Sequence, residues 1–521
     1  MRLIIRLDPN RARHWHLRLV QRLADAMQIP IALEWSGAAA PLPLAVTLMA
    51  AIEKAIYRLP GTNQFAPLRV EDFAPFAKRD AGRPDDIVLD LAGGGRRSYE
   101  RTWQLRFDGR RDEAAAIGAL IRSRTPVVSI VDAASGSEIV SGHPGLENSR
   151  VLACAFDDVM ARAATLVKAA LEGATPRHTG ERPAPARADL AAMAWFVFKS
   201  ISFELLVTLY RLVSNSPHWR VGYRFVKGGD MIDLRTHPAG GWRVLPDNGM
   251  HFYSDPFPVE KDGRLFVFVE DFEHRLDRAV ISVVEFDARG PLGTPRPVLD
   301  TGSHLSYPFV FEHAGEMWMV PESCTAGTVD LYRAERFPDG WVKQATLVPG
   351  VVASDPTLFE HQGRWWMFAT VRDGGCYSDA LYLWSAPDLL GPWAPHRHNP
   401  ILVDLATARP GGRVVRRGNK LIRPFQDCRK GYGGALGLAE IIRLDDDGFE
   451  QRVETIIGPG PLWPGRRLHT LNRAGPLECI DGSAVSRKFQ LMPSINIAAW
   501  PARPGRRDPA SIVARSGHSP R

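Results

Sequence analysis

The spacing of apolar positions changes from mixed helix and strand patterns to strand patterns alone near the middle of the chain. In the first 175 residues, apolar runs of strand length alternate with stretches whose apolar positions recur every three or four residues. The predicted strands are Leu3–Leu7, Ile87–Leu91 and Val127–Val131, and the predicted helices are His14–Met27 and Phe156–Leu171. Because such alternation is typical of sheets covered by helices, we expect residues 1–175 to form an α/β domain with a parallel or mostly parallel sheet.

Residues 176–215 are predicted to join this domain to the next one. Thr175–Arg187 is rich in Pro and charge, which predicts an exposed linker. Asp189–Leu212 is strongly apolar, and Asp189 is placed to cap its amino end. Lys199 and Glu204 near the middle argue against a membrane-spanning helix. We expect a helix docked on a domain face, with an interfacial helix that rests on a membrane as the alternative.

The chain repeats itself from residue 254 onward. Five segments share a polar residue, usually followed by Pro, then an apolar strand, a turn and a second apolar strand with a polar end. The lead residues are Asp255, Tyr307, Asp355, Arg409 and His469, spaced by 52, 48, 54 and 60 residues. Repeats of about fifty residues with several strands each are typical of β-propellers. We therefore predict an all-β five-bladed β-propeller over residues 216–500 and a disordered tail over residues 501–521.

Hairpin geometry predicts where a ligand would bind. The second strand of a hairpin runs back, so its end returns to the rim where the first strand begins. The predicted ring around one mouth of the channel contains Asp255, Glu270, Asp271, Tyr307, Glu322, Asp355, Arg409, Gln426, Asp427 and His469, with Asp481 as a further candidate. Convergent acids, an Arg, a His and an aromatic suit a ligand with many hydroxyls, such as a sugar. A structural role is the alternative for each acid, because such carboxylates often accept backbone N–H bonds.

Composition narrows the class of protein. The chain has 521 residues, 65 Lys and Arg against 58 Asp and Glu, and a net charge of +7. Its basic residues are dispersed among acids, which argues against nucleic-acid binding. Five cysteines without a CxxC pair, and a start without an apolar run of signal-peptide length, indicate free thiols and a cytoplasmic protein.

We expect no cofactor and no metal. Three histidines, His251, His304 and His469, fall near the predicted channel and could meet Asp255 around an ion. Ordinary hydrogen-bonding roles are the preferred interpretation for them.

The repeats resemble two known groups of proteins. The broader resemblance is to five-bladed glycoside hydrolases, on the Ser-Asp-Pro motifs at Ser254 and Ser354. The closer one is to the amino-terminal domain of the glucosamine inositolphosphorylceramide transferase family. It is carried by SYPFVFEHAGEMWMVPES from Ser306, SDPTLFEHQGRWWMFAT from Ser354, and the run from Ala408 into GYGGAL at Gly431.

The resemblance to inverting glycoside hydrolases implies catalytic roles for some ring residues. It implies a general base at Asp255 and a modulator of the acid's pKa at Asp355. The acid should be a Glu from the fourth blade, where this chain has Arg409, Gln426 and Asp427, so Glu322 is by elimination the best remaining proton donor. Such chemistry needs one protonated and one ionised carboxyl group at a suitable separation.

The first 175 residues resemble formyltransferase-like proteins more weakly, on DDIVLDLAGGG from Asp85 and TPVVSIVDAASGSEIV from Thr125. The region has no Asn-x-His motif, which argues against one-carbon transfer.

Three functions remain open for the whole chain. The first is an enzyme that cleaves or transfers a glycosyl unit of a glycolipid, glycoconjugate or surface polysaccharide intermediate. The second is a sugar-binding module without catalysis that presents substrate to a partner glycosyltransferase. The third is a scaffold. Peripheral membrane contact is compatible with each of them.

Overall fold

The computed structural model describes residues 2–27, 29–37, 44–59, 63–76, 85–93, 99–463 and 465–488. The predicted tail, 501–521, and the last residues of the predicted propeller region lie outside these ranges.

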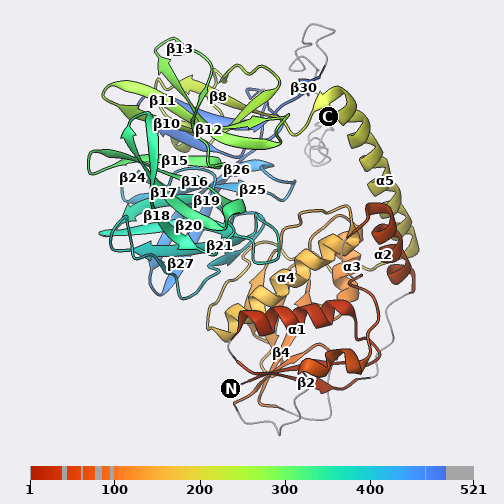
Figure 1. Cartoon of the computed structure of the whole chain (residues 1–521). Helices are drawn as coiled ribbons and strands as arrows, with labels where there is room; N and C mark the ends of the chain where they lie inside the picture. The colour runs from red at the N-terminus through yellow and green to blue at the C-terminus, as the bar shows by residue number, and fades with distance from the viewer. Residues whose placement is uncertain are drawn as a thin grey trace, which may run out of the picture. The chain divides into compact units, whose positions relative to one another are not determined.

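The amino-terminal part is an α/β domain built on one six-stranded sheet (Figure 1). Its strand order is β2-β1-β3-β4-β5-β6; the first four strands run parallel and the last two are antiparallel to their neighbours. The mostly parallel sheet predicted from the sequence is therefore confirmed. The strands are β1 (Leu3–Leu7), β2 (Ile31–Trp35), β3 (Ile87–Asp90), β4 (Arg101–Phe107), β5 (Val128–Asp132) and β6 (Glu138–Gly142).

Helices bury their apolar faces against this sheet and against one another. The long α4 packs on β5 and β6, and α1 and α3 pack on α4. The sequence predictions include β5, as Val127–Val131, but miss the strands β2, β4 and β6 and the helices α2 and α3. The helices are α1 (His14–Ala26), α2 (Leu44–Tyr57), a 3-10 turn (Val70–Phe76), α3 (Glu113–Ile121) and α4 (Leu152–Leu171).

Helix α5 (Leu190–Val213) follows the linker and remains largely exposed. Asp189 caps it as predicted, because its carboxylate accepts the N–H of Ala192 at 2.7 Å. Only Met193, Phe196 and Ser200 are buried, so the helix docks through a narrow strip. Among the described residues, α5 is the helix long and apolar enough to cross a membrane.

The rest of the chain forms five sheets that are the blades of a propeller, as predicted. Consecutive antiparallel strands make the first four blades. The first blade contains β10 (His251–Lys261), β11 (Arg264–Glu273), β12 (Arg278–Asp287), β13 (Gly290–Pro291) and β14 (Arg296–Leu299), and the second contains β15 (Ser306–His313), β16 (Glu316–Glu322), β17 (Thr328–Arg336) and β18 (Asp339–Pro349). The third contains β19 (Ala353–His361), β20 (Arg364–Val371), β21 (Ala380–Ala386), β22 (Ala394–Pro395) and β23 (Leu402–Val403). The fourth contains β24 (Val415–Arg417), β25 (Lys420–Asp427), β26 (Ala435–Asp445) and β27 (Gly448–Ile457).

The fifth blade is composite. Its inner hairpin, β28 (Leu471–Ala474) and β29 (Leu477–Ser483), pairs with β8 (Trp219–Phe225) and β9 (Arg243–Val244), which precede the first blade in sequence. Antiparallel pairing of β29 with β8 thus closes the ring and leaves neither strand as an open edge. A further pair, β7 (Ser214–Asn215) with β30 (Ser486–Arg487), lies just outside this closure.

The first strands of three blades share a backbone bulge at the predicted lead residue. Asp255, Tyr307 and Asp355 have φ of 48°, 43° and 55°, and the register with the second strand shifts at each of them. The left-handed region is unfavourable for residues with a Cβ and persists where surrounding contacts fix it. The repeat seen in the sequence therefore corresponds to a repeated bulge that re-aims one polar side chain per blade.

A buried ion pair joins the α/β domain to the third blade. Arg162 of α4 has no exposed surface and donates through Nε to Asp379 Oδ1 at 2.9 Å. It also donates to the carbonyls of Val371 and Cys376, and Asp379 accepts the N–H of Gly145 at 2.6 Å. Since each charge is paired and hydrogen-bonded, the contact is satisfied internally.

Candidate functional site

The hairpin registers bring the lead residues and the second-strand ends to the same rim. Ser254 pairs with Glu270, and Ser306 pairs with Glu322. In the fourth blade the N–H of Gln426 donates to the carbonyl of Arg409 at 2.8 Å. The predicted meeting of lead residues and strand ends is therefore present in these three blades.

Asp355 is the centre of one buried network. Arg409 donates to it from Nε at 2.7 Å and from Nη2 at 3.3 Å, and Gln426 Nε2 donates at 2.9 Å. The backbone N–H of Asp355 in turn donates to Glu322 Oε2 at 2.9 Å. Three blades thus meet in one cluster, in which Arg409 neutralises the acids around it.

Asp255 is the centre of a second network. It accepts Thr470 Oγ1 at 2.9 Å and the N–H of Tyr307 at 3.3 Å, and His469 Nε2 lies 3.5 Å from it. Its own N–H donates to Asp481 Oδ2 at 2.7 Å, and Asp481 also binds His469 Nδ1. These bonds link the fifth, first and second blades, so the two buried acids hold the blades together.

Burial governs the protonation of these acids. It raises the pKa of Asp255 to about 6, against the neighbouring charge of His469. It raises the pKa of Asp355 to about 7, although Arg409 opposes the shift. Burial disfavours the charged form of His469, but Asp481 and Asp255 outweigh it and raise its pKa. The site therefore holds carboxyl groups that take up protons well above the usual range.

Three further acids of the predicted ring bond to residues outside the Asp255 and Asp355 networks. Glu270 accepts Ser254 Oγ at 2.6 Å and lies 3.4 Å from His304. Asp271 points to the opposite face of its strand, where it bonds His251 and Ser282. Asp427 pairs with Arg429 at 2.7 Å. Of the three channel histidines named from the sequence, His469 alone pairs with Asp255 here.

A cavity of about 770 Å³ opens above the Arg409–Asp355 cluster. Glu322 and Arg409 line it, whereas Asp255 and Asp355 do not. The α/β domain supplies one wall, which sequence reasoning missed because nothing local marks that segment. The other lining residues are Ser123, Thr125, Leu146, Glu147, Asn148, Ser149 and Arg150 from the α/β domain, and His304, Cys324, Ser354, Cys376, Tyr377, Ser378, Leu405, Cys428, Arg429, Lys430, Gly431, Tyr432 and Arg467 from the propeller.

Tyr432 is the more exposed of the two tyrosines, Tyr377 and Tyr432, that line this cavity. It is 37% exposed, and Arg409 lies over its ring at 4.7 Å from the centroid. His469 packs edge-on against it, with Trp219 stacked on His469 at 4.3 Å. Tyr432 was not among the predicted site residues, although the GYGGAL run that contains it carries part of the family resemblance. A fixed aromatic ring beside polar groups suits the apolar face of a sugar ring.

Comparisons with known proteins concern the propeller. Residues 245–474 match the family model described as glucosamine inositolphosphorylceramide transferase 1, N-terminal. A rice protein (Oryza sativa subsp. japonica) named glucosamine inositolphosphorylceramide transferase 1 is 31% identical over 289 residues, which is 52% of this chain and 37% of that protein. The Arabidopsis thaliana protein of the same name is 32% identical over 290 residues, with 50% and 37% covered. The chain thus spans little more than a third of the length of these relatives.

Solved structures give more distant likenesses. A thermostable family-43 glycoside hydrolase is 16% identical with a TM-score of 0.32, over 41% of this chain and 81% of that one. Zg3597, a family 117 glycoside hydrolase from Zobellia galactanivorans, is 13% identical with a TM-score of 0.33, over 47% and 78%.

The family match falls on the blades whose bulged strands and polar ends build the site. Over residues 245–474, less than half of its length, this chain is thus similar to the glucosamine inositolphosphorylceramide transferase N-terminal family.

Proposed function

We propose that this protein recognises the headgroup of an anionic glycolipid in the cavity at the propeller mouth. The charge of the lining carries this proposal. Five cationic side chains line the cavity, together with the carboxylates of Glu147 and Glu322; the cations are Arg150, Arg409, Arg429, Lys430 and Arg467. Arg409 and Arg429 are paired with Asp355 and Asp427, and Arg150 lies 3.8 Å from Glu204. Lys430 and Arg467 are therefore the cations that the lining offers to a ligand. A cationic cavity with an exposed Tyr suits a ligand that combines a sugar or polyol with a phosphoryl or carboxylate group.

The relatives support the same class of ligand. Their name couples glucosamine with inositolphosphorylceramide, which is a polyol, a phosphoryl group and a ceramide. As a binding module, the propeller would hold such a headgroup and present it to a partner glycosyltransferase.

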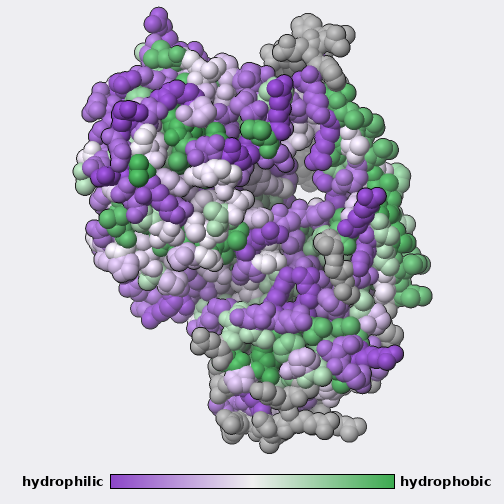
Figure 2. Space-filling view, viewed as in Figure 1, coloured by the Kyte–Doolittle hydropathy of each residue, from purple (hydrophilic) through white to green (hydrophobic). Residues whose placement is uncertain are grey.

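Two exposed helices provide a surface through which the chain would meet a lipid-linked ligand. On α2, four side chains spaced four residues apart point outward, and most large apolar side chains of α5 are exposed as well. Figure 2 shows this apolar surface as a green band along the edge where Figure 1 draws α5. The residues are Leu44, Leu48, Ile52 and Ile56 on α2, and Leu190, Trp195, Phe198, Ile201, Phe203, Leu205, Leu206, Leu209, Tyr210, Leu212 and Val213 on α5. A surface of this composition favours peripheral attachment to a membrane.

Glycosyl cleavage or transfer is the second candidate function. The raised pKa values of Asp255 and Asp355 favour it, since such chemistry needs a protonated carboxyl group near neutral pH. The oxygens of both Asp residues are nevertheless occupied by neighbours. Only Glu322, of the three predicted catalytic residues, lines the cavity. Binding therefore accounts for more of the geometry than two-carboxylate catalysis does.

The test combines retention and product analysis. The full chain is incubated with vesicles that carry hexosamine-, uronate- or pentose-containing glycolipids, and both bound lipid and product are measured by mass spectrometry. We expect retention of intact anionic glycolipid, and at least tenfold weaker retention in Lys430→Glu. Lys227→Glu is the matched control, because Lys227 is equally an exposed Lys but lies outside the cavity.

Two outcomes would change the conclusion. Product from the wild type that disappears in Glu322→Gln would establish the glycosyl-transfer alternative. If Lys430→Glu and Lys227→Glu retained anionic glycolipid equally well, and no better than neutral glycolipid, the proposed headgroup recognition would be contradicted.

A further inference from the structure

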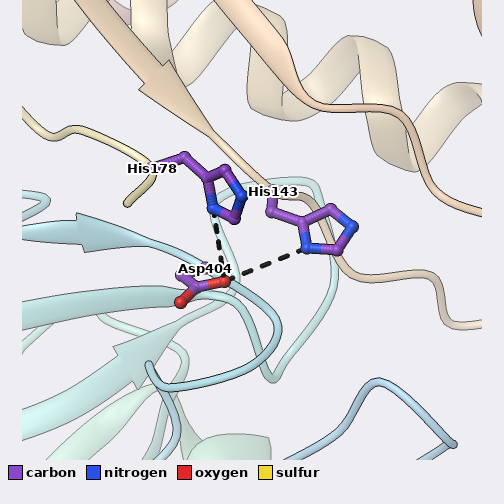
Figure 3. A group of neighbouring side chains, drawn as sticks. All are labelled: His143, His178 and Asp404. Carbon is purple, nitrogen blue, oxygen red and sulfur yellow. Dashed lines mark ion pairs between the residues drawn. The ribbon is translucent and has the colours of Figure 1, made fainter. Parts of the chain in front are cut away.

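A second cluster of titratable side chains lies away from the propeller mouth. His143 follows β6 of the α/β domain, His178 lies in the linker, and Asp404 belongs to the loop between β23 and β24 of the propeller. Their three nearest donor atoms lie within 4.8 Å of one another. Figure 3 shows both imidazole rings turned toward the same carboxylate oxygen from separate segments.

The backbone fixes two of the three residues. The N–H of His143 donates to the carbonyl of Val403 at 2.8 Å, and the N–H of Leu405 donates back to the carbonyl of His143 at 2.8 Å. His143 and Asp404 are consequently partners in an isolated parallel bridge. Their side chains are placed by main-chain bonds rather than by the attraction between them.

One ring nitrogen of His178 has no hydrogen-bond partner, although it is buried in the cluster. Its side chain is 6% exposed, and its Nδ1 is buried without a hydrogen-bond partner. The other ring nitrogen, Nε2, lies 3.4 Å from the carbonyl of Glu181, to which it donates. A neutral imidazole that donates from Nε2 carries a lone pair on Nδ1. That lone pair points at Asp404 Oδ1 across 3.8 Å, which is too far for a hydrogen bond.

The remaining ligand atoms are arranged in the same way. His143 Nδ1 lies 4.0 Å from the same Asp404 Oδ1. Asp404 is oriented by Thr407 Oγ1 at 2.7 Å and by the N–H of Ala406 at 3.1 Å. Outer hydrogen bonds of this kind are what hold metal ligands in place.

We propose that His143, His178 and Asp404 bind one divalent transition-metal ion, with zinc as the best match. Two imidazole nitrogens and one carboxylate oxygen are a donor set that zinc accepts, with the fourth position left to water. Ligand atoms around a tetrahedral zinc lie about 3.3 Å apart, so the gaps from His178 and His143 to Asp404 Oδ1 would close by about 0.5 and about 0.7 Å. The ion would tie the sheet of the α/β domain, the linker and the propeller loop together.

In the other acid–histidine cluster, the donor atoms already have hydrogen-bond partners. Asp255, His469 and Asp481 also have donor atoms within 4.8 Å of one another. Their atoms are bonded to one another, to Thr470 and to backbone N–H groups, so that cluster is complete without an ion.

The test measures metal binding by the full chain after treatment with a chelator. Co²⁺ serves as the spectroscopic probe and Zn²⁺ as the competitor. We expect one Co²⁺ per chain, displaced by Zn²⁺, and binding weakened at least tenfold in His178→Gln and in Asp404→Asn. His237→Gln is the matched control, because His237 also has Nε2 beside a carbonyl, that of Gly458, but its Nδ1 accepts from Trp242.

A variant-free measurement covers the case in which a substitution prevents folding. Modification of histidines by diethyl pyrocarbonate is mapped with and without Zn²⁺, and we expect protection of His143 and His178 together. Absence of stoichiometric binding by the wild type would overturn the proposal. So would binding that survives in His178→Gln and Asp404→Asn but is lost in His469→Gln.

Discussion

Arg409, just ahead of the fourth blade, donates to both carboxylate oxygens of Asp355 on the third blade, at 2.7 and 3.3 Å. Both side chains are buried, and Gln426 adds a third bond to the same carboxylate. Where the resemblance to inverting hydrolases leads one to expect an acid, this chain places a cation. That cation lines the cavity and pairs with the buried carboxylate of Asp355.

Removal of Arg409 should leave an uncompensated buried charge. We expect Arg409→Met to lower the free energy of unfolding by about 3–5 kcal/mol at pH 8, because Asp355 then loses its partner. In the double variant Arg409→Met/Asp355→Asn the loss should be smaller than the sum of the single losses. Urea denaturation of all four proteins measures this coupling. Strict additivity, within about 0.5 kcal/mol, would show that the pair carries no coupling energy.

The raised pKa values predict the direction of the pH dependence. Asp255 and Asp355 bind protons in the folded state up to about pH 6 and about pH 7, whereas in the unfolded chain they release them near pH 4. The folded state thus holds more protons in this window, and stability falls as the pH rises from about 4 to about 7. The raised pKa of His469 acts in the same direction.

Asp255→Asn tests this linkage. We expect its melting temperature to fall less than that of the wild type between pH 5 and pH 8. Other buried acids, such as Asp158 with its pKa raised to about 7, contribute equally to both proteins and cancel in the difference. Parallel melting curves across this range would contradict the assignment.

The exposed apolar helix predicts a membrane-binding defect. Leu206 of α5 is 63% exposed, and Leu292 of the first blade is 58% exposed. We expect Leu206→Glu to weaken sedimentation with lipid vesicles about tenfold, since burial of a Leu side chain contributes about 1.5–3 kcal/mol. Leu292→Glu makes the same chemical change on the propeller surface and should sediment like the wild type. Equal loss in both variants would point to general charge repulsion.

Loss of the buried ion pair between α4 and the third blade should lower the free energy of unfolding much more than loss of an exposed ion pair. Arg162→Met should cost about 3–5 kcal/mol of unfolding free energy, because Asp379 would be buried without its partner. Arg18→Met breaks a more exposed pair with Asp157, at 3.1 Å, and should cost less than about 1 kcal/mol. Guanidinium denaturation compares the two. Similar costs would indicate that the buried pair is not decisive for stability.

The sequence was sufficient for the blades because their local pattern repeats. Each bulge needs a polar lead residue and each hairpin needs its turn, so Asp255, Tyr307 and Asp355 were identifiable one by one. The predicted ring nevertheless included both Glu270 and Asp271, although neighbouring residues of a strand face opposite ways and Asp271 bonds His251 instead.

Long-range placement could not be read in the same way. The Leu146–Arg150 wall of the cavity, the partnership of Arg162 with Asp379, and the meeting of His178 with Asp404 join residues more than 200 positions apart. No local period encodes such contacts, because they depend on how the α/β domain packs against the blades. The exposure of α5 could not be predicted either, because its apolar composition is compatible both with a helix buried against a domain and with an exposed helix.

The composite fifth blade makes assembly of the ring a late event. Arg224 of β8 bonds Glu478 of β29, a partner 254 residues further along the chain. During synthesis β8 emerges early and has no inner hairpin to join until nearly the whole propeller has been made. Contacts of such large separation close slowly, and unpaired strand edges are prone to misassembly meanwhile. The first four blades can form in order, but the flanks of the first and the fourth stay uncovered until the last hairpin arrives.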